Sequence, residues 1–289
     1  MDIVEELRKA GFTRQADILS PLKSSFVRIV TTTATEDYFR VGESKIGGFP
    51  HLPAEFSWPM YDGKPLAFIA QFNLADIAPF DKDSKLPHAG ILYFFYEGGE
   101  KVWGFAPEDK GGCRVIHYTG DLENLKITEP PDGVSEYVDL SPCKLNFDVG
   151  VDYPTYETLD AVGLDAEVAR EFGEIKDKDR YDKIIADCER ESYGEHKFFG
   201  YPDLVQGEIF RDCQLASNGV NTGNGEIANN LKTKELEKGI SDWTLLLQID
   251  SDDNADLMWG DCGTVYFAIK KKDLELGIFD NVWVVFQCC

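Results

Sequence analysis

Short apolar runs separated by turn residues recur along most of the chain and predict a fold rich in β-strands. Gly, Pro, Asn and Asp punctuate these runs, which is typical of strands joined by loops. The runs that we expect to form strands lie at 24–33, 65–74, 89–97, 101–107, 113–120, 125–131, 135–148, 242–250, 263–269 and 281–288. Prolines and glycines between Gly47 and Pro59 oppose regular structure in that stretch.

Helical spacing follows the strand-rich first half. Apolar side chains recur there at intervals that place them on one helical face, at Val168, Phe172, Ile175, Tyr181, Ile184, Ile185 and Cys188. We expect two helices, joined at 176–179. Near the N-terminus, Asp2 caps a short helix, Glu5 completes a capping box, and a second helix follows Thr13. Further short helices are predicted at 233–239 and 271–277.

Three segments of the first half reappear in the same order in the second half. The pairs are 47–52 with 199–204, 67–73 with 244–250, and 90–95 with 263–268. Collinear matches indicate an internal repeat from an ancient duplication of a β-rich unit. The sequence therefore predicts an α+β fold with two related β-rich lobes, antiparallel sheets and peripheral helices. We expect one domain over 1–289, with lobes at about 25–150 and about 195–289 and a helical insert at about 155–193.

The repeat aligns two glutamines that interrupt apolar strands, Gln71 and Gln248. A buried amide needs hydrogen-bond partners or it costs free energy. Either each amide bonds the backbone of a nearby loop or of the other lobe, or both face a shared cavity and bind a polar ligand. Both readings stay open at this point.

The charge balance excludes some partners. The chain carries 52 acidic against 29 basic residues and a formal net charge of −23. Nucleic acids and anionic membrane surfaces repel such a chain, whereas basic partners or cations suit it. The alternative is that the acidic residues only maintain solubility.

The sequence indicates a cytoplasmic protein that engages no membrane. The N-terminus lacks the order of a signal peptide, and no apolar run approaches the roughly 18 residues of a membrane span. Seven cysteines without a C-x-x-C pair fit reduced thiols. Cys288 and Cys289 resemble a prenylation signal, but they end an apolar run typical of a strand, which argues against lipidation.

The most acidic stretch, "QIDSDDNADLMWGDCG" at 248–263, lies between two expected strands. Its spacing partly matches an EF-hand loop, with candidate carboxylate ligands at Asp250, Asp252, Asp256 and Asp261. Ala255 stands where that loop needs glycine, and strands replace the flanking helices. A looser Ca²⁺ or Mg²⁺ site stays open. The alternative is a strand-connecting loop whose aspartates bond backbone amides above a packed Trp259.

Two further residues are candidates for catalysis. His196 is the best candidate for a general base, although a histidine bonded to neighbouring backbone explains it as well. Cys262 is a candidate nucleophile, but no cysteine-hydrolase signature surrounds it. Zinc-binding histidine spacings and phosphate-binding glycine loops are missing from the sequence. No cofactor is therefore indicated.

Long motifs in both halves resemble one known family. "GGFPHLPAEFSWP", "GKPLAFIAQFNLADI" and "LPHAGILYFF", followed by "HKFFGYP" and "LLLQIDSDDNADLMWGDCG", are similar to the YwqG-like family over roughly residues 40–289. The resemblance implies a cytosolic α+β protein and no defined activity. Phe199 stands where the family pattern has glycine, so we expect a less open turn before Gly200.

We expect a non-catalytic binding module for a protein or a small polar ligand, held in a cleft between the lobes. The candidate ligand-binding residues are Gln71, Gln248, His196, Trp259 and Asp261. The alternative is a metal-assisted hydrolase that uses Ca²⁺, Mg²⁺ or Mn²⁺ at the acidic 250–261 loop.

Overall fold

The computed structural model describes residues 2–135, 138–159, 162–164, 168, 170, 177–189, 196–223 and 231–289. The described helices are α1 (Ile3–Lys9), α2 (Thr13–Leu19), α3 (Leu74–Ile77), α5 (Lys178–Glu189), α6 (Ile209–Ala216), α7 (Leu231–Glu237) and α8 (Lys271–Glu275). The described strands of the first half are β1 (Ser24–Thr33), β2 (Lys45–Ile46), β3 (His51–Pro53), β4 (Met60–Tyr61), β5 (Lys64–Pro65), β6 (Ala67–Asn73), β7 (Ile91–Tyr96), β8 (Cys113–Tyr118), β9 (Leu125–Ile127) and β10 (Cys143–Asp152). Those of the second half are β11 (His196–Phe199), β12 (Trp243–Asp250), β13 (Thr264–Lys270) and β14 (Trp283–Gln287).

The main sheet has ten described strands in the order β14-β13-β12-β11-β1-β10-β2-β6-β7-β8. Each neighbouring pair is antiparallel. Two small antiparallel pairs, β3 with β9 and β4 with β5, lie apart from it. The α+β class with antiparallel sheets is thus confirmed.

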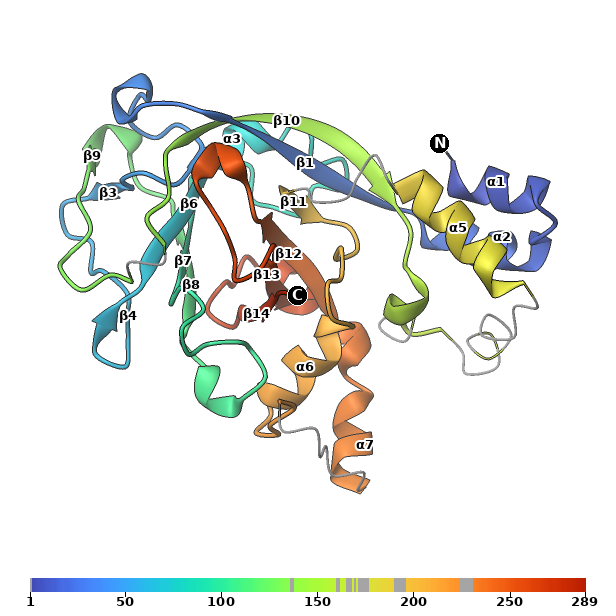
Figure 1. The fold of residues 1–289 in the computed structure, drawn as a ribbon. Helices are drawn as coiled ribbons and strands as arrows, with labels where there is room; N and C mark the ends of the chain where they lie inside the picture. Colours follow the sequence, from blue (N-terminus) through green and yellow to red (C-terminus); the bar gives the residue numbers. More distant parts are fainter. Residues whose placement is uncertain are drawn as a thin grey trace.

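The long strands β1 and β10 form the centre of this sheet (Figure 1). They pair from Ser24 opposite Asp152 to Thr33 opposite Cys143. Four strands follow on each side: β11 to β14 next to β1, and β2, β6, β7 and β8 next to β10. Two of the matched pairs of sequence segments therefore lie on corresponding strands, 67–73 and 244–250 on β6 and β12, and 90–95 and 263–268 on β7 and β13. Even a register shift recurs, between Phe68 and Ala70 in β6 and between Leu245 and Leu247 in β12.

The two sides of the sheet pack against each other over a shared core. Phe94 on β7 and Phe267 on β13 have ring centroids 5.1 Å apart, although six other strands separate β7 from β13 along the sheet. Phe72 and Phe198 are 4.7 Å apart. Because one buried cluster contains side chains from both sides, the division into two lobes stays a prediction.

Helices cover the periphery in two groups (Figure 1). The first group joins α1, α2 and α5 around a buried cluster that includes Leu7, Leu19 and Tyr181. The carboxylate of Asp2 caps α1 by accepting hydrogen bonds from two of its backbone N–H groups, as predicted. The second group places α6 against a cluster with Trp243 and Val285. Of the two helices expected at about 165–190, α5 is confirmed, and the other falls largely outside the described residues.

Some local predictions were wrong. The expected strand at 101–107 is irregular, because Pro107 begins a short 3-10 helix and Gly104 has a φ of +88°. Helix α6 was not predicted; the carboxylate of Glu208 caps it by accepting hydrogen bonds from the backbone N–H groups of Phe210 and Arg211. The proline-rich stretch before Pro59 contains the three-residue strand β3, which needs only a single partner, β9.

Candidate functional site

Two buried lysines begin a pair of matching polar clusters. Lys45 on β2 is 0% exposed and lies opposite Gln71, and Lys197 on β11 is 1% exposed and lies opposite Gln248. A buried ammonium group requires an ionic partner. Lys45 pairs with Glu36. Lys197 lies between two carboxylates, Asp203 at 2.9 Å and Asp152 at 3.5 Å.

In each cluster, a carboxylate that pairs with the buried lysine also accepts a hydrogen bond from the turn that follows the strand of that lysine. Phe49 donates its backbone N–H to Glu36 Oε2 at 3.2 Å, and Tyr201 donates its backbone N–H to Asp152 Oδ2 at 2.9 Å. This approach requires glycine. A Cβ added at Gly48 would lie 2.2 Å from Glu36 Oε2, and one at Gly200 would lie 2.3 Å from Asp152 Oδ2.

Phe199 adopts the backbone conformation of the glycine that it replaces. Its φ is +67°, compared with +70° at Gly47, its counterpart in the first half. The expectation of a less open turn is therefore wrong. The buried Phe199 ring packs near Phe198, with centroids 6.0 Å apart, and this packing offsets a left-handed conformation that costs about 1–2 kcal/mol.

The two predicted ligand-binding glutamines are fully buried and have local partners. Gln71 Oε1 accepts from the backbone N–H of His51 at 2.7 Å, and its Nε2 donates to the Glu43 carbonyl at 2.8 Å. Gln248 Oε1 accepts from the backbone N–H of Asp203 at 2.9 Å, and its Nε2 donates to Asp203 Oδ2 at 2.8 Å. This geometry favours the structural reading of both amides. Ligand binding by them remains a prediction.

The clusters differ at one position, His51 in the first and Asp203 in the second. Burial and the positive charge of Lys45 lower the pKa of His51 to about 4. In the second cluster, burial outweighs the attraction of Lys197 and raises the pKa of Asp152 to about 6. Among the described residues, neither His51 Nε2 nor Asp152 Oδ1 has a hydrogen-bond partner. The second cluster thus contains one more carboxylate than the first.

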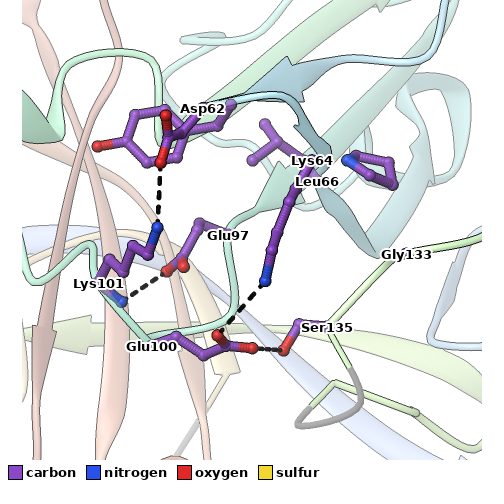
Figure 2. Close-up of a pocket in the computed structure, with 10 residues that line it drawn as sticks. Asp62, Lys64, Leu66, Glu97, Glu100, Lys101, Gly133 and Ser135 are labelled. Atoms are coloured by element: carbon purple, nitrogen blue, oxygen red, sulfur yellow. Dashed lines mark hydrogen bonds and ion pairs between the residues drawn. The ribbon is translucent and has the colours of Figure 1, made fainter.

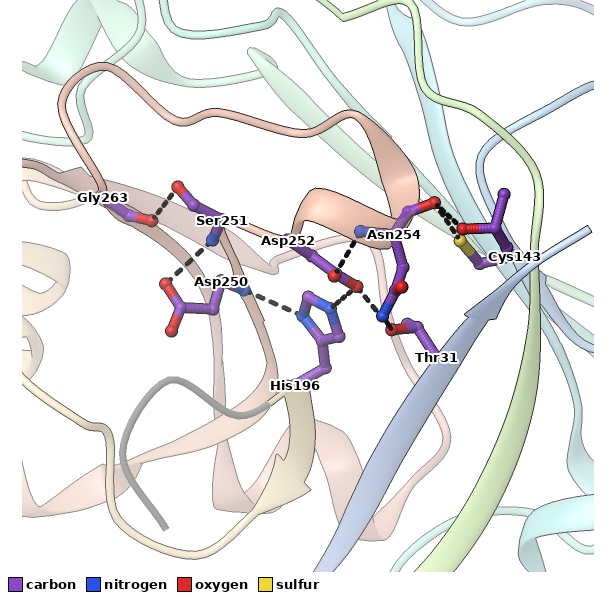
Figure 3. Close-up of polar contacts among 9 residues, drawn as sticks. Thr31, Cys143, His196, Asp250, Ser251, Asp252, Asn254 and Gly263 are labelled. Carbon is purple, nitrogen blue, oxygen red and sulfur yellow. Dashed lines mark hydrogen bonds and ion pairs between the residues drawn. The ribbon is translucent and has the colours of Figure 1, made fainter. Parts of the chain in front are cut away.

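His196 precedes Lys197 and connects β11 to the acidic loop (Figure 3). Its Nδ1 accepts from the backbone N–H of Asp250 at 3.0 Å, so the proton of the neutral ring lies on Nε2, which is 3.0 Å from Asp252 Oδ2. Thr31 donates to the same oxygen at 2.6 Å. Burial raises the pKa of Asp252, but the hydrogen bonds from His196 and Thr31 outweigh it and lower that pKa to about 2. Both ring nitrogens of the predicted general base are therefore engaged.

The other candidate metal ligands have separate partners. Asp250 Oδ1 accepts from the Ser251 N–H and the Thr264 hydroxyl, both at 2.8 Å. Asp256 accepts from the Ser141 hydroxyl, and Asp261 is exposed at the far end of the loop. Within the described part of the chain, no three His, Cys, Asp or Glu side chains are grouped to hold a metal ion. The metal site and the hydrolase that depends on it stay untested predictions.

Trp259 and Cys262 occupy opposite environments in the same loop. Trp259 is 2% exposed, and its ring packs edge-on against Tyr96 with centroids 5.8 Å apart. Its Nε1 has no hydrogen-bond partner among the described residues. Cys262 is exposed beside β14 at the end of the loop, whereas His196 is buried at the loop's start.

A shallow surface pocket gathers charged residues that the sequence did not single out (Figure 2). It is lined by Tyr61, Asp62, Lys64, Pro65, Leu66, Glu97, Glu100, Lys101, Gly133 and Ser135. Lys101 Nζ lies 3.0 Å from Asp62 Oδ2, and Ser135 donates to Glu100 Oε1 at 2.8 Å. The backbone N–H of Lys101 donates to Glu97 Oε2 at 3.1 Å. Three segments far apart in the sequence build this pocket, so no local motif could have revealed it.

The fold defines an α+β protein with a large antiparallel sheet. The profile of the "Domain of unknown function (DUF1963)" matches residues 44–288, and the chain belongs to this family. No curated protein matches the chain. None of the helices among the described residues is long and apolar enough to cross a membrane.

Proposed function

We propose that the protein is a non-catalytic binding module for a small polar ligand that carries positive charge. The pocket of Figure 2 is the observation on which this rests. Its charged side chains are three acids, Asp62, Glu97 and Glu100, and two bases, Lys64 and Lys101, which gives it a net charge of −1. The net charge of −23 on the whole chain adds a field that attracts cations.

The state of the reactive side chains supports a non-catalytic role. The pKa of His51 is lowered to about 4 by burial, and both ring nitrogens of His196 are engaged. Burial raises the pKa of the Cys113 thiol to about 12 and that of the Cys143 thiol to about 11. A thiol needs to ionise before it attacks, so these two cysteines are poor nucleophiles near neutral pH.

This proposal differs from the sequence-based one in the position of the ligand. The pocket residues lie between Tyr61 and Ser135, within the first half and away from a cleft between lobes. We further propose that the chain is a YwqG-like member of its family, on the motifs quoted above. The seven free cysteines support the cytoplasm as its compartment.

Isothermal titration with spermidine tests the proposal. We expect measurable binding to the wild-type protein, and Asp62→Asn and Glu100→Gln should each weaken it several-fold because each removes a charged partner for an ammonium group. Lys101→Met should strengthen it by removing the ammonium that occupies Asp62.

Glu123→Gln is the matched control. It removes one negative charge at an exposed position outside the pocket, so it should bind spermidine as the wild-type protein does. Absence of binding at millimolar spermidine, or an equal loss in Asp62→Asn, Glu100→Gln and Glu123→Gln, would show that the pocket does not recognise cations.

A further inference from the structure

The motif "WGDCG" and the segment "QCC" are far apart in the sequence but adjacent in the structure. Strands β13 and β14 pair up to Thr264 opposite Gln287. Two residues after Gln287, the Cys289 backbone N–H donates to the Asp261 carbonyl at 3.3 Å. The residues that follow Asp261 and precede Thr264 therefore lie beside Cys288 and Cys289.

The side chain of Cys288 packs against the glycines of this loop. A Cβ added at Gly263 would lie 2.6 Å from Cys288 Cβ, and one added at Gly260 would lie 2.8 Å from Cys288 Sγ. Cys288 is only partly exposed and packs on the main core. Its thiol is thus directed under the loop.

The two cysteines next to this contact are neighbours at the ends of the paired chain segments. Cys288 lies against Gly263. The residue before Gly263 is Cys262, and the residue after Cys288 is Cys289. Both are exposed, in contrast to the buried Cys113, Cys143, Cys188 and Cys213.

Cys262 also has a backbone conformation that is uncommon for its residue type. Its φ is +54°, in the left-handed region that glycine favours. Such strain persists where the surrounding structure holds it, here between Trp259, whose carbonyl accepts from Gly263, and the strand pair.

We propose that Cys262 and Cys289 form a disulfide with each other. The oxidant is a low-molecular-weight disulfide such as oxidised glutathione. One protein thiolate attacks a sulfur of the oxidant and releases one reduced small thiol. The second protein thiolate attacks the resulting mixed disulfide and releases the other. The two protons lost by the cysteines go to the two released thiols. The product joins the end of the acidic loop to the end of β14.

Peptide mapping of the oxidised full-length protein tests this pairing. After incubation with oxidised glutathione and alkylation of free thiols, cleavage at Lys and Arg should give a disulfide between peptides 239–270 and 273–289, which contain Cys262 and the Cys288–Cys289 pair. The intact mass should fall by two hydrogen atoms. The four buried cysteines should react with alkylating reagent only after unfolding.

Serine variants separate the possible partners. Cys262→Ser and Cys289→Ser should each abolish the cross-link, and Cys288→Ser should retain it, with unchanged melting temperatures under reducing conditions. Oxidation should slow hydrogen exchange in the loop 251–263 of the wild-type protein and leave it unaltered in Cys262→Ser. A cross-link that survives in Cys289→Ser, a disulfide within 288–289, or a stable mixed disulfide at Cys262 would overturn the proposal.

Discussion

The backbone N–H of Asp250 donates to Nδ1 of His196 at 3.0 Å. In the first half, the backbone N–H of Asn73 donates to the Ser44 hydroxyl at 2.9 Å. Each acceptor immediately precedes a buried lysine, and each donor ends a corresponding strand. The histidine that looked catalytic in the sequence thus occupies the place of a serine that holds two strand ends together.

Replacing His196 should destabilise the protein. His196→Ala removes two hydrogen bonds and leaves the Asp250 N–H and the Asp252 carboxylate without this partner, so we expect a loss of about 2–4 kcal/mol in the free energy of unfolding. Urea denaturation measures it. The exposed His88 is the matched control, and His88→Ala should stay within about 0.5 kcal/mol of the wild-type value. Equal stability of the two variants would contradict a structural role for His196.

Replacing Gln248 by a residue of similar size should have a comparable effect. Gln248→Leu keeps the volume but deprives the Asp203 N–H and carboxylate of their amide partner, which should cost about 2–3 kcal/mol. Thermal and urea unfolding report the loss. Gln206→Leu, at an exposed position, should leave stability nearly unchanged. If Gln248→Leu unfolds like the wild-type protein, the amide does not have the structural role that its hydrogen bonds to Asp203 indicate.

Asp152 and His51 should give stability opposite dependences on pH. The pKa of Asp152 is raised from 3.8 to about 6 in the folded state, so its contribution is present below pH 3.8 and is lost as pH rises through 6. The pKa of His51 is lowered from 6.5 to about 4, so its contribution is present above pH 6.5 and is lost as pH falls through 4. These two contributions largely cancel between pH 4 and 6.5.

Single substitutions should reveal each contribution. In Asp152→Asn, the unfolding free energy should rise by about 2–3 kcal/mol from pH 4 to 6.5, because only the His51 contribution remains. In His51→Gln it should fall by a similar amount over the same range. Urea titrations at several pH values measure both slopes. Asp148→Asn, exposed on the same strand as Asp152, should keep the wild-type profile, and parallel profiles in all variants would refute the assignment.

A Cβ at Gly200 should be tolerated less well than one at another left-handed glycine. Gly200→Ala combines a φ of +70° with a contact of 2.3 Å to the Asp152 carboxylate, and we expect a loss of about 3 kcal/mol or more. Gly219 has a φ of +87° but nothing within 4 Å of the added atom, so Gly219→Ala should lose only about 1–2 kcal/mol. Equal losses would mean that the carboxylate moves away freely.

The sequence predicted most of the strands because burial in a sheet leaves apolar runs. β6, β7, β12 and β13 read directly from such runs. The polar clusters could be predicted only in part. Gln71 and Gln248 were visible as polar residues in apolar strands, but Glu36 and Asp152 lie in unremarkable surroundings and reach the lysines only through the fold. The pocket around Glu100 was hidden for the same reason, since exposed charges on separate segments look like ordinary solvated surface.

The order of strands in the sheet has a consequence for the integrity of the chain. β1 lies beside β11, and β10 lies beside β2, so the N-terminal strand completes the side of the sheet that the C-terminal strands build. A backbone break between β10 and β11 would remove the covalent link between β11 to β14 and β1, the strand beside which they assemble. The two fragments would then be expected to remain together as a non-covalent pair, as in a split protein that reassembles from its parts.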